Sequence, residues 1–135
     1  MRRKNSAYTQ DVREQIAEAE RVLAVDYLEA QRFRGDLAER MARLFTRVDG
    51  LALPTSRVVA PRLAESDQYL LVLSENCVPW SFIGFPAVSV PCGLTPDQRL
   101  PVGIEFVAAP LDDGVLLALG SAVEAALGMP LLPGG

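Results

Sequence analysis

Few side chains in this sequence could act in catalysis. It contains no histidine, which excludes a Ser-His-Asp or Cys-His arrangement and any histidine-containing metal site. The single lysine, Lys4, lies in a polar N-terminal stretch, whereas a catalytic lysine must be desolvated so that its pKa falls enough for it to act as a base. Without a base, neither Cys77 nor Cys92 is expected to form a nucleophilic thiolate. We therefore predict no catalytic residue in this chain.

Acidic residues and glycines do not supply an alternative chemistry. Most acids belong to predicted helix faces or neighbour an arginine that keeps them ionised, and Asp112 with Asp113 is better explained as a helix cap than as a catalytic pair. No paired Cys-x-x-Cys motif indicates a metal site, and no glycine-rich loop indicates a phosphate site. The sequence accordingly predicts no metal and no cofactor.

Composition narrows the class of protein. The chain has 135 residues, half of them hydrophobic and 22% charged, which is typical of one folded domain. Its net charge of −4 disfavours nucleic acid as a partner, because phosphate binding needs clustered Lys and Arg. The longest apolar tract, Val115–Leu132, is interrupted by Glu124, Gly128 and Pro130, so a buried helix explains it better than a membrane span. With two cysteines and no apolar export signal, we expect reduced thiols in a cytoplasmic protein.

Four segments are expected to form helices. From Thr9 to Leu23 apolar residues recur at helical spacing, and Val58–Asn76 fits a helix or a strand, of which we favour the helix. A pattern in Val25–Arg47 carries one apolar stripe, and another in Val115–Leu127 ends before a glycine. The stripe of the Val25–Arg47 pattern consists of Phe33, Leu37, Met41, Leu44 and Val48.

Three short apolar runs indicate β-strands. Leu51–Leu53 ends at a proline, which cannot donate to a strand ladder. Ala87–Val90 lies between two prolines, and a polar turn separates it from Val102–Val107, so these two runs should form adjacent strands. Apolar strands and single-striped helices need each other to bury their faces. We therefore expect one sheet that contains all three strands, with helices packed on its faces, which is an α/β architecture.

Four motifs in order resemble the late portion of amidase-signature enzymes. Asp26–Ala30 is similar to the family's Asp-Tyr-x-x-Ala, and Asp49–Thr55 to its Asp-x-Leu-x-x-Pro-Thr. Asn76–Gly93 ends in the pattern Gly-x-Pro-Ala-x-Ser-x-Pro-x-Gly, and Leu100–Val107 is similar to the strand that begins Leu-Pro-Val-Gly-x-Gln. The resemblance covers about residues 9 to 128. It departs from the family at three positions, with Cys77 in place of Thr, Ser81 in place of Asn and Glu105 in place of Gln.

The resemblance implies a fold and a division of the chain. It implies a partial α/β/α sandwich, with three to four strands of a mixed sheet flanked by helices. Residues 1–8 would form an N-terminal tail, and residues 9–135 the C-terminal part of an amidase-signature domain. Members of the family hydrolyse carboxamides with a serine nucleophile, a second serine held by a cis peptide and a buried lysine. Those residues lie earlier in the family's chains and match no position here, where no Ser-Ser pair occurs.

The resemblance also suggests four substrate-binding candidates. Asn76, Cys77, Trp80 and Ser81 belong to the part of the family that approaches the substrate pocket. The alternative for Trp80 is an aromatic residue of the core or of an interface. The alternative for Asn76 is a side chain that caps a loop.

These observations predict a segment of an amide hydrolase that acts through an acyl-serine intermediate. The segment would supply scaffold and one pocket wall, as a truncated gene product, one half of a split enzyme or an isolated segment. A non-catalytic binding or assembly module derived from an amidase is the alternative. We expect an N-terminal amidase fragment or a second copy as partner, because a strand such as Val102–Val107 would expose an unpaired edge, and a small amide substrate only in the complete enzyme.

Overall fold

The computed structural model describes residues 8–97 and 99–128, and the chain divides into two compact units within α2 (Ala24–Leu44). The first unit, Met1–Asp36, contains α1 (Gln10–Ala19) and the beginning of α2. Thr9 is the N-cap of α1, and its backbone is extended there. Neither helix has a buried residue. The described part of the first unit therefore has no hydrophobic core of its own.

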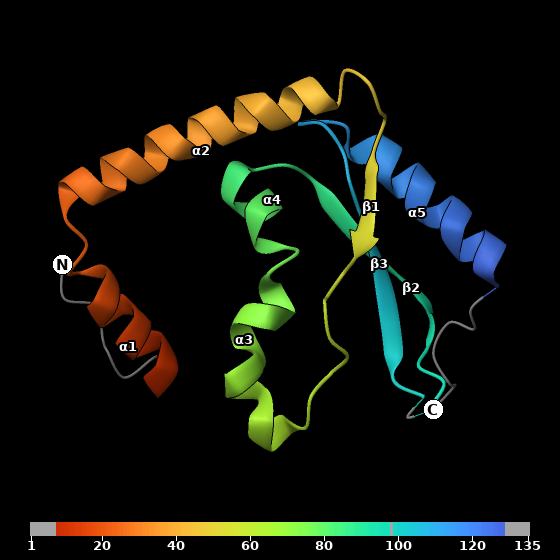
Figure 1. Ribbon diagram of the computed structural model, residues 1–135, viewed down its shortest axis with the longest axis horizontal. Helices are drawn as coiled ribbons and strands as arrows, with labels where there is room; N and C mark the ends of the chain where they lie inside the picture. The colour runs from red at the N-terminus through yellow and green to blue at the C-terminus, as the bar shows by residue number, and fades with distance from the viewer. Residues whose placement is uncertain (1–7, 98, 129–135) are drawn as a thin grey trace. The chain divides into compact units, whose positions relative to one another are not determined.

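The second unit, Leu37–Gly135, contains one three-stranded sheet (Figure 1). Its strands are β1 (Leu51–Pro54), β2 (Ala87–Leu94) and β3 (Pro101–Val107), in the order β1-β3-β2. The prediction that the three apolar runs share one sheet is confirmed.

Two details of the predicted sheet are wrong. A mixed sheet was expected, but both pairings in the described part of the chain are antiparallel. The loop between β2 and β3 is too short for the crossover that parallel neighbours require. The apolar run Val102–Val107 was expected to expose an edge, but β3 is the central strand and pairs on both sides. Among the described residues, the open edges of the sheet belong to β1 and β2.

Strand β2 continues past the proline at which the sequence indicates its end. The register with β3 shifts between Pro91 and Gly93, and the strand then extends to Leu94. Proline is tolerated there because β2 has a neighbour on one side only. Gly93 has φ 152°, a conformation that side chains disfavour, so glycine permits the irregularity.

Helix α5 (Asp113–Leu127) covers one face of the sheet. The buried residues of this layer are Val90, Phe106, Ala108 and Leu116. A Cβ at Gly120 would lie 3.3 Å from Val90 Cγ1, so the absent side chain lets the helix approach β2 closely. The helix ends at Gly128, whose φ of 58° is left-handed, as the sequence predicts. In the described residues no helix is long and apolar enough to cross a membrane.

The opposite face of the sheet packs against α4 (Val78–Ile83) and the C-terminal part of α2. Ile83, Phe85 and Val107 are buried there, and Val107 is fully inaccessible. Leu37 and Met41 of the predicted stripe pack on this cluster. Helices therefore cover both faces, as expected, because neighbouring residues of β3 point to opposite sides of the sheet.

The segment between β1 and α4 is helical in its second half. An irregular stretch leads to a short 3-10 helix, η2 (Leu63–Glu65), and then to α3 (Ser66–Ser74). The preference for a helix over a strand in Val58–Asn76 is thus confirmed from Ser66 onward. No residue of α3 is buried, and Leu71 is 85% exposed.

Candidate functional site

Two hydrogen bonds fasten the end of β1 to the junction between α3 and α4. The side-chain amide of Asn76 donates to the carbonyl oxygen of Pro54 at 2.7 Å. The thiol of Cys77 donates to the carbonyl oxygen of Thr55 at 3.3 Å. Two predicted site residues therefore hold the backbone at the end of β1.

An ion pair continues this attachment one step further along the chain. The guanidinium of Arg57 lies 2.6 Å from the carboxylate of Glu75. Both side chains are more than half exposed, so the pair contributes at most about 1 kcal/mol.

The fastened end of β1 positions a pair of hydroxyl groups. Thr55 Oγ1 lies 2.5 Å from Ser89 Oγ, across the central strand. The Thr55 N–H donates to the carbonyl oxygen of Gly103 at 3.0 Å, which continues the ladder one residue beyond β1. A Cβ at Gly103 would lie 2.8 Å from Thr55 Oγ1 and 2.9 Å from Ser89 Oγ. The two hydroxyls can meet only because the strand between them carries a glycine.

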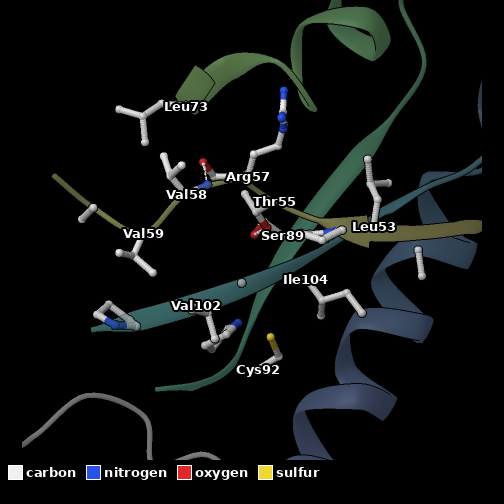
Figure 2. Close-up of a pocket in the computed structure, with 17 residues that line it drawn as sticks. Leu53, Thr55, Arg57, Val58, Val59, Leu73, Ser89, Cys92, Val102 and Ile104 are labelled. Carbon is white, nitrogen blue, oxygen red and sulfur yellow. Dashed lines mark hydrogen bonds between the residues drawn. The ribbon is translucent and has the colours of Figure 1, made fainter. Parts of the chain in front are cut away.

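The hydroxyl pair borders a cavity of about 840 Å³ beside β1 and β3 (Figure 2). In Figure 2 Thr55 and Ser89 lie side by side in its wall, between the chain that leaves β1 and the strand β3. The wall is mainly apolar, and its described residues include no acid. The lining residues are Ala52, Leu53, Pro54, Thr55, Ser56, Arg57, Val58, Val59, Ala60, Leu73, Ser89, Pro91, Cys92, Pro101, Val102, Gly103 and Ile104.

A buried carboxyl group lies on the same strand, two residues from Gly103. Glu105 is 5% exposed and pairs with Leu53 on one side and Ser89 on the other. Its Oε2 atom is buried and has no hydrogen-bond partner among the described residues. Burial raises the pKa of Glu105, and the neighbouring Cys77 thiol opposes this change in part.

Cys77 is not activated as a nucleophile in this environment. Desolvation raises the pKa of the Cys77 thiol, and the neighbouring Glu105 carboxyl raises it further. A thiolate requires the opposite change, which positively charged neighbours produce. The thiol therefore acts as a hydrogen-bond donor to β1.

The other two predicted site residues lie on α4. The ring of Trp80 packs against the cluster of Ile83, Phe85 and Val107, in agreement with the core alternative, and its buried Nε1 has no partner in the part of the chain described. Ser81 is exposed. Asn76, Cys77, Trp80 and Ser81 do not line the cavity, and their contact with a substrate stays a prediction.

Sequence reasoning did not select Thr55, Ser89 or Gly103 as site residues. A glycine in the middle of an apolar strand was the available signal, because it often marks close approach of other groups. It did not show which groups approach. Within residues 8–97 and 99–128, no cluster of three or more His, Cys, Asp or Glu side chains could hold a metal ion.

Comparison with protein families matches residues 2–117 to the family described as Amidase. The chain belongs to the amidase family. This amidase-family chain is 35% identical over 113 residues to the A subunit of glutamyl-tRNA(Gln) amidotransferase from Streptomyces coelicolor. The match includes 78% of the chain but 23% of that relative. The amidase-family chain thus spans about a quarter of the length of this relative.

Solved structures support the same relationship. A crystal structure of an amidase matches with a TM-score of 0.71 and 28% identity, over 90% of the amidase-family chain and 29% of the matched chain. The structure of 6-aminohexanoate cyclic dimer hydrolase complexed with substrate matches with a TM-score of 0.76, over 90% of the chain and 30% of its own. At 24% identity the latter shows the fold alone. The chain therefore has a partial amidase fold.

Proposed function

We propose that this chain is the C-terminal segment of a hydrolase of carbon–nitrogen amide bonds. It supplies scaffold and one wall of the substrate pocket, and the serines and lysine of an acyl-serine mechanism come from another segment. This proposal rests on the observation that 78% of the chain matches only 23% of the S. coelicolor relative. The sequence itself supports the division of labour, because it contains no histidine and no lysine other than Lys4.

The attachment of β1 supports the assignment of a pocket wall. Asn76 and Cys77 bond to consecutive carbonyl groups at the end of β1, and the next hydroxyl, that of Thr55, faces the cavity. We propose that Asn76 and Cys77 position this wall, and that Trp80 and Ser81 line the pocket in the complete enzyme. The free thiols of Cys77 and Cys92 support a cytoplasmic location.

The purified chain should release no ammonia from simple aliphatic or aromatic amides or from glutamine. No group in it combines a nucleophile with a base, and the Cys77 thiol has a raised pKa. An ammonia assay checks this expectation, with enzyme-free buffer as the reference. Amide hydrolysis that persists in the Ser81→Ala and Ser89→Ala variants would contradict the proposal that this chain lacks catalytic residues. Hydrolysis that is lost in the Cys77→Ala variant alone would contradict it as well.

The chain should associate with an amidase segment that contains the catalytic residues. We would co-express it with the part of the S. coelicolor relative that precedes the counterpart of this chain. Open edges on β1 and β2 and exposed apolar side chains such as Leu71 and Leu117 favour association, since each removes backbone groups or apolar surface from water. Co-elution in size-exclusion chromatography is the expected result. Separate elution of the folded chain as a monomer would contradict the proposal.

A stand-alone binding or assembly module is the second candidate function. The observation in its favour is that the second unit contains buried clusters on both faces of its sheet without any further chain. In that case the open edges would join copies of this chain. Light scattering would then show a stable homo-oligomer that does not exchange with the S. coelicolor segment.

A further inference from the structure

The thiol of Cys77 lies beside two hydrogen-bond acceptors but carries a single proton. It donates to the carbonyl oxygen of Thr55 at 3.3 Å. Its other neighbour is the carboxyl group of Glu105. Because a thiol has one S–H donor, it cannot bond fully to both groups at once. The stronger acceptor therefore decides whether the Thr55 carbonyl group stays attached to the junction between α3 and α4.

Glu105 is buried without a partner for its charge. Its side chain is 5% exposed, and its Oε2 atom has no hydrogen-bond partner in the described part of the chain. Of the residues opposite it in the neighbouring strands, Leu53 has no side-chain donor, and the Ser89 hydroxyl already contacts Thr55 Oγ1. The Cys77 thiol is therefore the donor best placed to bond to a carboxylate at this position.

The other charges on this side of the sheet are exposed to water. The ion pair between Arg57 and Glu75 is more than half exposed, and α4 contains no charged residue. The charged residues of α3 and of the part of α2 that belongs to the second unit are exposed as well, namely Glu39, Arg40, Arg43 and Asp67. Solvent screens such charges. The ionisation of Glu105 is therefore the main electrostatic change at this thiol between acidic and neutral pH.

Ionisation of the carboxyl group changes the competition for the thiol proton. A carboxylate forms charge-assisted hydrogen bonds that are about twice as strong as those between neutral groups. We propose that Glu105 controls the attachment of β1, because its ionised carboxylate accepts the Cys77 S–H in place of the Thr55 carbonyl group and so loosens the end of the strand. Glu105 releases its own proton to solvent, whereas the thiol proton stays on sulfur.

The direction of this pH dependence follows from the burial of Glu105. Burial raises its pKa, so the Thr55 attachment is intact in acid and is released as the pH rises through the folded pKa, above the ordinary value of 4.5. Thr55 stays tied to β3 through its N–H, and Asn76 still holds Pro54. The loosening therefore affects the chain that leaves β1, residues 55–60, which lines the cavity. The inference concerns this chain alone and does not depend on the proposed function.

Raman spectroscopy of the S–H stretching band tests which acceptor the thiol uses. The variant Cys92→Ala of the full chain leaves Cys77 as the only thiol. Its band should shift to lower frequency between about pH 4.5 and pH 7.5, because a carboxylate is a stronger acceptor than a carbonyl group. The double variant Cys92→Ala with Glu105→Gln is the matched control, and its band should stay constant. A constant band in Cys92→Ala, or an equal shift in the control, would overturn the proposal.

Amide hydrogen exchange at Thr55 tests the loosening in a chain that keeps both cysteines. At about pH 7.5 the Thr55 amide should exchange at least about threefold faster in the original chain than in Glu105→Gln, whereas at about pH 4.5 the two rates should agree. Each comparison is made at one pH, which removes the intrinsic pH dependence of exchange. In Cys77→Ala the attachment is absent, so Glu105→Gln should no longer slow the exchange. Equal rates in the original chain and Glu105→Gln at the higher pH would contradict the proposal, even if Cys92→Ala does not fold.

A different donor for the carboxylate would give a different result. The buried Nε1 of Trp80 has no partner among the described residues, and Trp80 is the only tryptophan of the chain. If the indole N–H bonded to ionised Glu105, tryptophan fluorescence would change with pH while the S–H band stayed constant. That outcome would overturn the role of Cys77. It would leave the amidase assignment in place, because the assignment rests on the comparison with relatives.

Discussion

Replacing Gly103 with alanine is expected to lower the free energy of unfolding by about 1 to 3 kcal/mol, the usual cost of overpacking. The new Cβ would lie 2.8 Å from Thr55 Oγ1 and 2.9 Å from Ser89 Oγ, closer than normal contacts. The backbones of both neighbours are held in the sheet, since Thr55 is bonded to β3 and Ser89 lies within β2. The two hydroxyls would therefore have to rotate away and give up their contact, or the strands would have to shift.

Urea unfolding followed by circular dichroism measures this effect. Gly114→Ala is the matched control, since a Cβ there meets nothing within 4 Å and the helix α5 tolerates alanine well. The cost of Gly103→Ala should shrink when Thr55 and Ser89 are both replaced by alanine, which a double-mutant cycle detects as coupling. Equal stability of Gly103→Ala and Gly114→Ala would show that the hydroxyls do not crowd this strand.

The strands and helices could be predicted because their signals are local. Apolar runs bounded by turn residues predicted β1 and β3, and the glycine at residue 128 predicted the end of α5. The end of β2 was missed because Pro91 looked like a terminator. Proline ends a strand only where its nitrogen would have to bond to a neighbour, and the place of β2 at the edge depends on the topology of the whole sheet.

The candidate site was harder to predict because its parts are distant in sequence. Thr55 and Ser89 are 34 residues apart, and the register of two strands against β3 brings them together. The family resemblance suggested Asn76 and Cys77 as site residues. It could not show that their side chains bond to the carbonyl groups of Pro54 and Thr55. Sequence spacing gives the direction of a side chain along one element, whereas a contact between elements requires the register.

Glu105→Gln is expected to remove a pH dependence of stability. Burial raises the pKa of Glu105 in the folded chain above the ordinary value of 4.5. Between 4.5 and the folded pKa, the folded state therefore holds a proton that the unfolded state has released. The stabilisation is complete below pH 4.5 and is lost as the pH rises through the folded pKa, with a slope of at most about 1.4 kcal/mol per pH unit. Glutamine has no such proton, so the variant should lack this loss.

Urea unfolding of both proteins at about pH 4.5, 6.0 and 7.5 tests this expectation. The variant should gain stability relative to the original chain as the pH rises, because a neutral amide replaces a carboxylate whose Oε2 has no partner among residues 8–97 and 99–128. The range ends at about pH 7.5 because the Cys77 thiol, whose pKa is also raised, would add a dependence of the same sign in alkaline solution. Glu39→Gln is the control, since Glu39 forms an exposed ion pair with Arg43. Parallel curves for the original chain and Glu105→Gln would mean that the buried carboxyl group finds a partner on folding that compensates its charge.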